Sequence, residues 1–462
     1  MNKITKDSQM MWKEFSFSGS AFSVFRQFYD EPYAFLLESS LVDRPGARYS
    51  FIGASPFWVL RSSQSKSLAD LRNKLNQFSL APQKQLGPFL TGAVGFLSYD
   101  DGLNLPLVLF CFYDAAITID HWLKKLYVFS SGFPEKGTRA KRRAEWRMKQ
   151  ILLRLDGIKE NPIEEEVIPL ANFNSNGIVS NFTKAQYLQA VKKALKYIRS
   201  GDIYQVNLSQ RLVIAAQPDY LSIYSRLRRL SPSPFAALFD AGNFQILSAS
   251  PERFLKLSGK KVVTQPMKGT RRRGNEEKED IFLREDLLKS TKDKSELLMI
   301  VDLLRNDLGR VCEYGSIKVS RMRELEEYAT VFQTTATIEG ELHSGKDRID
   351  LLKAAFPGGS ITGCPKIRAM EIIKELEPDP RGIYTGSLGY LSFTGDMDLN
   401  ILIRTILFKQ GHAYFSAGGG IVSGSSPEKE YEETLIKARP LFSALTVPAF
   451  SEERDYAVCL HK

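Results

Sequence analysis

The sequence has few of the residues that cross-link small domains or bind metals through sulfur and nitrogen. It contains four cysteines and four histidines in 462 residues. The cysteines stand far apart with no Cys-x-x-Cys pair, and the histidines show no local spacing typical of a metal site or a catalytic triad. The amino end is charged and lacks the apolar core of a secretion signal. We therefore predict a protein of the reducing cytoplasm without a disulfide framework.

Long hydrophobic runs are also missing. The most apolar stretch, PLVLFCFYDAAIT at 106–118, is too short to span a bilayer and carries Asp114 in its middle. We interpret it as one buried strand and expect no membrane partner. The net charge is +10, but the basic runs at 136–149, 226–229 and 271–273 lack interleaved aromatic residues. These runs favour solvated helix faces over a nucleic-acid site.

Several nucleotide-binding and hydrolase motifs are absent too. The chain has no phosphate-binding P-loop, no glycine-rich dinucleotide fingerprint, no zinc-protease H-E-x-x-H and no G-x-S-x-G nucleophile turn. Of the residues in the chain, 43% are hydrophobic and 25% are charged, so the chain can bury one large core or two ordinary ones. A disordered or collagenous chain is thereby excluded.

Composition along the chain divides it into four segments. An amino-terminal part at 1–155 is followed by a linker at 156–181 that is rich in Asn, Pro, Gly and acid. A second part at 182–446 follows, and a short tail covers 447–462.

The periodicity of the second part predicts alternating strands and long helices. Thr183 and Gln186 form a capping box that predicts a helix over 184–199. Further helices are expected over 276–307, 365–376 and 427–439, with hairpin-like strands between them. This pattern indicates an α+β fold with antiparallel sheet flanked by helices.

Two pairs of carboxylates stand three residues apart on expected helices. Asp293 with Glu296, and Glu430 with Glu433, would each share one helix face. Two such faces brought together would offer the oxygen ligands that Mg²⁺ prefers. From spacing alone, solvated acid is the more common explanation of such pairs.

Two glycine-rich loops and one lysine remain open to more than one interpretation. The loop PGGSITG at 357–363 precedes Pro365 and a helix, which would suit an anion, while AGGG at 417–420 would let a ligand approach the backbone. A tight turn or bulge explains either loop equally well. Lys268 is either an exposed charge or a desolvated amine nucleophile, and local spacing leaves both open.

An ordered set of sequence blocks resembles the chorismate-utilising enzymes. Between 180 and 440 the blocks are GDIYQVNLSQR, SPERFL, PMKGTRRRG, ELLMIVDLLRNDLGRV, FPGGSITGCPKIRAMEII, GSLGYLSF, LNILIRT, SAGGGIV and EYEET. LLESS at 36–40 and ARYSFIG at 47–53 extend the likeness to the amino-terminal part of anthranilate synthase component I. The resemblance implies a single large α+β domain with two stacked antiparallel sheets, built from both halves of the chain.

Two positions place the chain among the branches of that family. The water-using isochorismate branch has lysine where this chain has Gln205, and the ammonia-using branch has glutamine. Anthranilate synthases usually have alanine at the position of Lys268, whereas aminodeoxychorismate synthases share the PxKGT sequence seen here. The chain thus resembles the aminodeoxychorismate branch, which serves para-aminobenzoate and folate synthesis. An anthranilate synthase component I and a non-catalytic scaffold subunit are the alternatives.

The resemblance also implies roles for individual residues. Glu252 would act as general acid and Lys268 as covalent nucleophile, in a site that includes Gln205. Mg²⁺ would bind Glu296 and Glu433, with Asp293 and Glu430 holding waters around it. The implied contacts to chorismate come from Gly269, Thr270, Tyr384, Arg404, Gly418, Gly419, Gly420, Lys437 and Gln333, the last standing where relatives often have histidine.

Partners are implied in the same way. No segment resembles a glutamine amidotransferase, so a separate glutaminase subunit would form a heterodimer with this chain and supply ammonia. A downstream aminodeoxychorismate lyase would release pyruvate, because the tail is too short for a lyase domain. Glu38, Ser39 and Pro234 resemble the family's tryptophan pocket, for which ordinary strand packing is the competing explanation.

Overall fold

Antiparallel strands build two sheets in the computed structural model, which describes residues 10–41, 48–64, 67–156, 177–274, 276–328 and 331–446. The first sheet has 12 strands, and β9 (Ile178–Ser180) pairs with β10 beside its main path. Its order is β1 (Met11–Ser16), β8 (Lys125–Ser130), β7 (Ala115–Asp120), β3 (Tyr49–Gly53), β2 (Phe35–Glu38), β11 (Phe235–Asp240), β12 (Gln245–Ser250), β21 (Thr405–Lys409), β22 (His412–Ile421), β10 (Gln205–Ala215) and β18 (Gly363–Cys364).

The second sheet has 10 strands, and β16 (Lys318–Glu327) pairs with β17 beside its main path. Its order is β15 (Met267–Arg272), β17 (Val331–Glu341), β14 (Lys261–Gln265), β13 (Arg253–Ser258), β20 (Met397–Asn400), β19 (Ser387–Ser392), β5 (Gly92–Leu97), β6 (Val108–Tyr113) and β4 (Trp58–Ser62).

Both sheets contain strands from both halves of the chain. In the first sheet, β2 pairs with β11 over Phe35–Glu38, and in the second β5 pairs with β19 over Gly92–Leu97. The fold is therefore one α+β domain with two stacked antiparallel sheets, as the sequence predicted. The amino-terminal part and the second part share each sheet, so neither has a sheet of its own.

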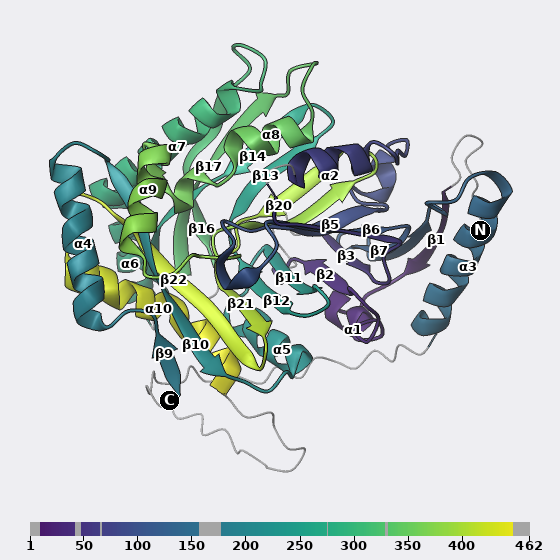
Figure 1. Cartoon of the computed structure of the whole chain (residues 1–462), viewed down its shortest axis with the longest axis horizontal. Coiled ribbons are helices and arrows are strands. Elements are labelled where there is room, and N and C mark those ends of the chain that lie inside the picture. The colour runs from purple at the N-terminus through teal and green to yellow at the C-terminus, as the bar shows by residue number, and fades with distance from the viewer. Residues whose placement is uncertain are drawn as a thin grey trace.

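Helices cover the outer faces of the two sheets (Figure 1). In Figure 1, α4 and α3 lie at opposite ends of the molecule, and α2 and α8 lie together along another side. The helices are α1 (Ala21–Phe25), α2 (Ser67–Leu75), α3 (Gly137–Leu155), α4 (Lys184–Arg199), α5 (Tyr220–Leu230), α6 (Glu277–Lys289), α7 (Thr291–Gly309), α8 (Arg348–Ala355), α9 (Lys366–Leu376) and α10 (Pro427–Thr446), with short 3₁₀ turns η1 (Lys84–Leu86), η2 (Gly102–Asn104) and η3 (Gly359–Ile361).

Apolar side chains fill the space between the sheets and the space under the helices. One cluster joins Phe35 and Phe239 of the first sheet to Phe96 and Leu388 of the second. Two larger clusters pack helices onto the outer faces, and a fourth packs α4 and α9 around Val206 of β10. Strands such as β5 and β6, buried along their whole length, read as continuous apolar runs because both of their faces are covered.

The stretch 106–118 is not one strand, as predicted, but two. β6 ends at Tyr113 in the second sheet and β7 begins at Ala115 in the first, so Asp114 marks the crossing between sheets. The Asp114 carboxylate is fully buried and pairs with Arg143 at 2.7 Å and Arg147 at 3.2 Å, both from α3. These two arginines belong to the basic run at 136–149, and the structure uses them to compensate a buried charge.

The helix predicted over 184–199 is confirmed, with both hydrogen bonds of the Thr183 and Gln186 capping box. The one predicted over 276–307 is wrong in part, because it is two helices that meet at Ser290. Ser290 has an extended backbone and its hydroxyl caps the nitrogen of Asp293, so it ends α6 and begins α7. The helix expected to stop at 439 runs through Pro440 to Thr446.

Two sequence predictions fall outside the described residues. Most of the linker, at 157–176, and the tail at 447–462 are not described. No helix in the described part of the chain is long and apolar enough to cross a membrane.

Candidate active site

A cavity of about 660 Å³ opens between the two sheets at one end. β10 and β22 of the first sheet border it on one side, and β15 and β17 of the second sheet border it on the other. The first turn of α7, one face of α10 and the loop at η3 complete the wall. The predicted site residues that line it are Glu252, Lys268, Gly269, Thr270, Asp293, Glu296, Gln333, Tyr384, Arg404, Gly418, Gly420, Glu430, Glu433 and Lys437.

One serine joins the two residues expected to do covalent and acid chemistry. The Ser360 hydroxyl donates to Oε1 of Glu252 at 2.5 Å, and the Ser360 carbonyl accepts from Nζ of Lys268 at 3.1 Å. Lys268 also lies 2.9 Å from Oε1 of Glu296. The lysine, the two glutamates and Ser360 therefore form one connected group inside the cavity.

Glu252 is suited to hold a proton near neutral pH. Its side chain is buried, and burial raises the pKa of the carboxyl to about 7, although the Ser360 hydroxyl and the charge of Lys268 act in the opposite direction. A carboxyl with this pKa is protonated in a large fraction of molecules at neutral pH. It can donate that proton to a leaving oxygen in the cavity.

The carboxylates around Lys268 favour its charged form over the free amine that a nucleophile requires. Burial is the largest single influence and lowers the pKa of Lys268, but the carboxylates of Glu296, Glu252 and Glu433 together outweigh it and raise the pKa above its usual value. Lys268 is therefore an ammonium ion held by carboxylates here. A nucleophilic role requires that its proton leave when substrate enters.

Gln205 lies next to this group but does not line the cavity. Its Nε2 donates to Oε1 of Glu296 at 2.8 Å, and its side chain is fully buried at the start of β10. Gln205 and Lys268 thus bind the same oxygen of Glu296. This contact positions the glutamate.

The four predicted metal carboxylates lie around the cavity, each beside a cation. Glu433 is 2.7 Å from Nζ of Lys437, Glu430 is 3.6 Å from Nζ of Lys292, and Asp293 is 3.2 Å from Nη2 of Arg271. The described residues contain no group of three or more such side chains that could hold a metal. Glu296 from α7 and Glu433 from α10 offer two carboxylates to the same cavity, a donor set that fits Mg²⁺ completed by water and substrate oxygens.

Arg404 is the cation best placed to receive an anion. It lines the cavity, its φ of 50° is in the left-handed region, and its Nη1 donates to the Ser231 hydroxyl at 3.3 Å. No ion pair joins it to a carboxylate in the described part of the chain. Burial lowers the pKa of this guanidinium, which shows a desolvated positive charge without a full counter-charge.

The other expected substrate contacts are partly engaged with protein. Lys437 donates to the Gly418 carbonyl at 2.9 Å, and Nε2 of Gln333 donates to the Thr270 hydroxyl at 3.2 Å. Tyr384 is buried, which raises the pKa of its hydroxyl, so the group stays a hydrogen-bond donor. Gly269 has a φ of 74° between Lys268 and Thr270.

The glycine run of β22 has a different use from the one we expected. A Cβ on Gly420 would lie 2.3 Å from Nε2 of Gln205, and one on Gly418 would lie 2.7 Å from the Leu208 carbonyl oxygen. A Cβ on Gly419 would meet the Glu430 carboxylate at 3.2 Å, and Gly419 does not line the cavity. These glycines leave room for side chains of the site as much as for a ligand.

The loop at 357–363 is also not the anion site that its sequence suggested. The Thr362 hydroxyl donates to the Gly358 and Gly359 carbonyls, and the Ser360 hydroxyl donates to Glu252. Both hydroxyls are therefore used within the protein. The loop positions Glu252 and Lys268 instead.

Sequence reasoning missed Ser360 and Asn207 as site residues. Ser360 stood in a loop whose hydroxyls were noted, but its partners lie more than 90 residues away. Asn207 stands two residues after Gln205 in a strand, so the two share a face. Polar residues at alternate positions of an otherwise apolar strand were the signal for it.

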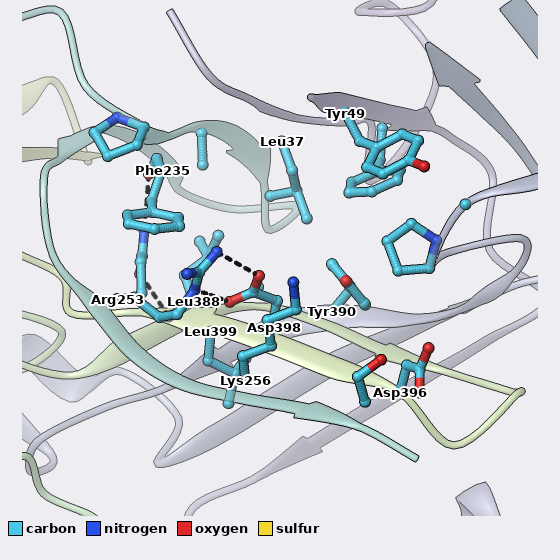
Figure 2. A pocket seen from close by; sticks show the side chains of 18 of the residues that line it. Leu37, Tyr49, Phe235, Arg253, Lys256, Leu388, Tyr390, Asp396, Asp398 and Leu399 are labelled. Atoms are coloured by element: carbon cyan, nitrogen blue, oxygen red, sulfur yellow. Dashed lines mark hydrogen bonds and ion pairs between the residues drawn. The ribbon is translucent and has the colours of Figure 1, made fainter. Parts of the chain in front are cut away.

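A second cavity, of about 590 Å³, lies between the same two sheets (Figure 2). Leu37, Phe235 and Tyr390 line it, and Figure 2 shows the guanidinium of Arg253 joined to the Asp398 carboxylate. Glu38 and Pro234, two of the residues predicted to bind tryptophan, border this cavity.

Ser39 and Glu38, which were predicted to bind tryptophan, use their polar groups in contacts with other protein groups. Ser39 does not line the cavity, and its hydroxyl bonds to the backbone of Leu41. The Glu38 carboxylate accepts from the Tyr224 hydroxyl at 2.9 Å and pairs with Arg228 at 2.9 Å, both on α5. Ser39 thus has no contact with the cavity, and the charge of Glu38 is compensated by protein.

Residues 20–443 match a family described as chorismate binding enzyme. The chain belongs to this family. It is 36% identical over 454 residues to anthranilate synthase component 1 of Acetivibrio thermocellus, with 92% of each chain covered. It is equally, 36%, identical over 446 residues to aminodeoxychorismate synthase component 1 of Klebsiella aerogenes, covering 90% of this chain and 94% of that one.

A solved structure agrees with this assignment. The crystal structure of anthranilate synthase component I from Streptococcus pneumoniae TIGR4 aligns with a TM-score of 0.75 at 32% identity, covering 86% of this chain and 93% of that chain. The protein is therefore a chorismate-utilising enzyme of the anthranilate and aminodeoxychorismate synthase component I type. Overall identity does not separate these two activities, because relatives of both names are about equally similar.

Proposed function

We propose that this chain converts chorismate and ammonia to 4-amino-4-deoxychorismate. The observation that supports this choice most is the place of Lys268, whose Nζ lies within the cavity beside Glu296 and Ser360. Anthranilate synthases usually have alanine there, and an alanine would leave the cavity without an amine nucleophile. A lysine in this position makes a covalent route to carbon 4 available.

The proposed reaction uses two displacements, each with allylic shift. The Lys268 amine, once deprotonated, forms a bond to ring carbon 2 while the 4-hydroxyl takes the Glu252 proton and leaves as water. Ammonia then forms a bond to carbon 4, and the bond between carbon 2 and Lys268 breaks with its electron pair returning to the lysine nitrogen. The proton that the new ammonium group releases returns to Lys268, and the proton that Lys268 gives to solvent before the first step replaces the one that Glu252 donates.

Arg404, Tyr384 and Lys437 would bind the carboxylates of chorismate. Arg404 is the strongest candidate because its charge is desolvated and lacks a carboxylate partner among the described residues. Mg²⁺, held by Glu296 and Glu433, would neutralise the ring carboxylate and these glutamates. Asp293 and Glu430 would hold its waters.

Two further proteins belong to this proposal. A separate glutaminase subunit would supply ammonia as the partner in a heterodimer, and added ammonium salt should replace it in vitro. A lyase would convert the product to para-aminobenzoate. Tryptophan binding in the second cavity stays a prediction.

Product identification tests the proposed function. The purified chain is supplied with chorismate, Mg²⁺ and an ammonium salt at mildly alkaline pH, and products are identified by mass and fluorescence. We expect an amine that retains the enolpyruvyl group and that an added lyase converts to para-aminobenzoate. Fluorescent anthranilate with released pyruvate would favour the anthranilate alternative, and no turnover with intact chorismate binding would favour a scaffold subunit.

A further inference from the structure

Three amide side chains at the active site carry an oxygen with no hydrogen-bond partner in the described part of the chain. These are Oε1 of Gln205, Oδ1 of Asn207 and Oε1 of Gln333. Their residues are only 0%, 7% and 4% exposed. Buried amide oxygens are almost always paired, so three unpaired ones at one site call for donors from a ligand.

The proposed substrate does not supply enough donors for this set. An amide oxygen only accepts hydrogen bonds, so it does not bind a carboxylate. Chorismate has two carboxylates and an enol ether, and its single hydroxyl is its one donor. Asn207 and Gln333 both line the cavity. One of their oxygens can bind the hydroxyl, and the other needs a different donor.

Asn207 is held rigidly with its side-chain oxygen unpaired. Its backbone nitrogen donates to the Thr362 carbonyl at 2.8 Å, and its carbonyl accepts from Nη2 of Arg381 at 2.8 Å. Arg381 is itself fixed by Glu377, at 2.7 Å, in a buried ion pair. These contacts fix the backbone of Asn207 beside the cavity, while its side-chain oxygen has no partner among the described residues.

Asn207 lines the same cavity as the reacting groups and is bonded to the loop that holds them. Thr362, which binds the Asn207 backbone, is two residues from Ser360, which joins Glu252 to Lys268. The oxygen also lies 3.0 Å from the position of a Cβ on Gly418, which lines the same cavity. Gln333, by contrast, is tied to Thr270 on the second sheet.

We propose that Oδ1 of Asn207 binds the ammonia nucleophile. Ammonia would donate one N–H to this oxygen and keep its lone pair free for attack on the chorismate ring. Gln205, on the same face of β10, lies outside the cavity lining, so Asn207 is the residue of this strand that offers an unpaired oxygen to the cavity. The inference rests on the proposed function in one respect only, the use of ammonia, which the anthranilate alternative shares.

Steady-state kinetics with ammonium salt as the varied substrate tests the proposal. Loss of one neutral hydrogen bond in Asn207→Ala should raise the KM for ammonia about tenfold. The KM for chorismate should stay within about twofold. Gln333→Ala should show the opposite pattern, a raised KM for chorismate with little change in that for ammonia.

Asn181→Ala is the matched control. The Asn181 amide oxygen accepts from the backbone nitrogen of Arg211, which lies on β10 together with Asn207. Asn181 does not line the cavity. Its KM for ammonia should match the wild-type value. If Asn207→Ala raises both KM values equally, or leaves that for ammonia unchanged, the assignment is overturned.

A second measurement keeps the proposal testable if Asn207→Ala turns over too slowly for kinetics. The covalent adduct with chorismate, formed without ammonia, is followed by intact-protein mass and then challenged with ammonium. We expect adduct formation as in the wild type but slower discharge by ammonium. Unimpaired discharge would contradict the proposal, whereas absence of adduct in the wild type would count against the proposed function instead.

Discussion

The two cavities between the sheets differ in how their charged side chains are satisfied. In the active-site cavity, Lys268, Glu296 and Glu252 share partners, and the amide oxygens nearby have none among the described residues. In the second cavity, Arg253 is bidentate to Asp398 and stacks over the ring of Phe235 at 4.7 Å. The polar groups of the active-site cavity can therefore form new contacts with a ligand. The Arg253 and Asp398 pair of the second cavity already satisfies its own charges.

Adjacent residues of one segment serve the two cavities. Glu252 borders the active site, and Arg253, the next residue, borders the second cavity. The backbone there is fixed because the Glu252 carbonyl accepts from the nitrogen of Ile401 at 3.0 Å. A single rigid crossing between sheets therefore supports both sites, although only one of them carries the chemistry.

The largest expected effect is that of Lys268→Ala. Without the amine, the covalent route is lost, and turnover to the amine product should fall about 10³-fold or more. The control is Lys261→Ala, which removes an exposed lysine that pairs with Glu339 at 2.9 Å on the same sheet. Wild-type turnover in Lys268→Ala would contradict the covalent role of Lys268 and leave Glu252 and Arg404 as the charged residues that distinguish the first cavity.

Glu252→Gln comes next, with an expected loss of about 10²–10³-fold in kcat. The variant has the shape of Glu252 but no proton to donate. The ratio of the wild-type rate to the variant rate reports the titration of Glu252 alone. Lys268, the charged residue that faces Glu252, is present in both proteins, so its effect cancels in the ratio. Since the pKa of Glu252 is about 7, the ratio should be constant at lower pH and fall as pH rises through that value. A ratio independent of pH would argue against the acid role.

Arg404→Gln should raise the KM for chorismate about 10–100-fold, because a charge-assisted hydrogen bond to a carboxylate is lost. This KM is measured from initial rates at varied chorismate concentration. Arg305→Gln, which removes an exposed arginine paired with Asp302, should leave the KM unchanged. An effect of Arg404→Gln on kcat alone would mean that this cation does not bind the ground-state substrate.

The smallest effect concerns the second cavity. If it binds tryptophan, Phe235→Ala should weaken binding about tenfold by removing an aromatic contact, while leaving the KM for chorismate unchanged. Calorimetric titration measures the affinity. Absence of binding at millimolar tryptophan would retire the pocket as a ligand site and leave the Arg253 and Asp398 pair a purely structural feature.

The regular parts of the fold were predictable from local pattern. The capping box at Thr183, the helix at 184–199 and the antiparallel character of the sheets follow from spacing and turn residues. The break at Ser290 was missed because helical residues flank it on both sides, and only its cap geometry separates α6 from α7. The crossing at Asp114 was missed because its stabilising arginines come from a distant helix.

The site was predictable in its residues and much less in its contacts. Helical spacing placed Asp293 with Glu296, and Glu430 with Glu433, and all four line the cavity. The pairing of Lys268 with Glu296, which raises the pKa of the lysine, depends on the meeting of two sheets and a helix. Local sequence carries no information on such long-range electrostatics, so a neutral amine looked plausible.

The most direct test of the covalent role of Lys268 is peptide mass mapping after exposure of the wild-type chain to chorismate and Mg²⁺ without ammonia. We predict an adduct that retains the enolpyruvyl group, located on the peptide that contains Lys268 and discharged by added ammonium to 4-amino-4-deoxychorismate. An unmodified Lys268 peptide together with direct formation of anthranilate after ammonium is added would contradict it.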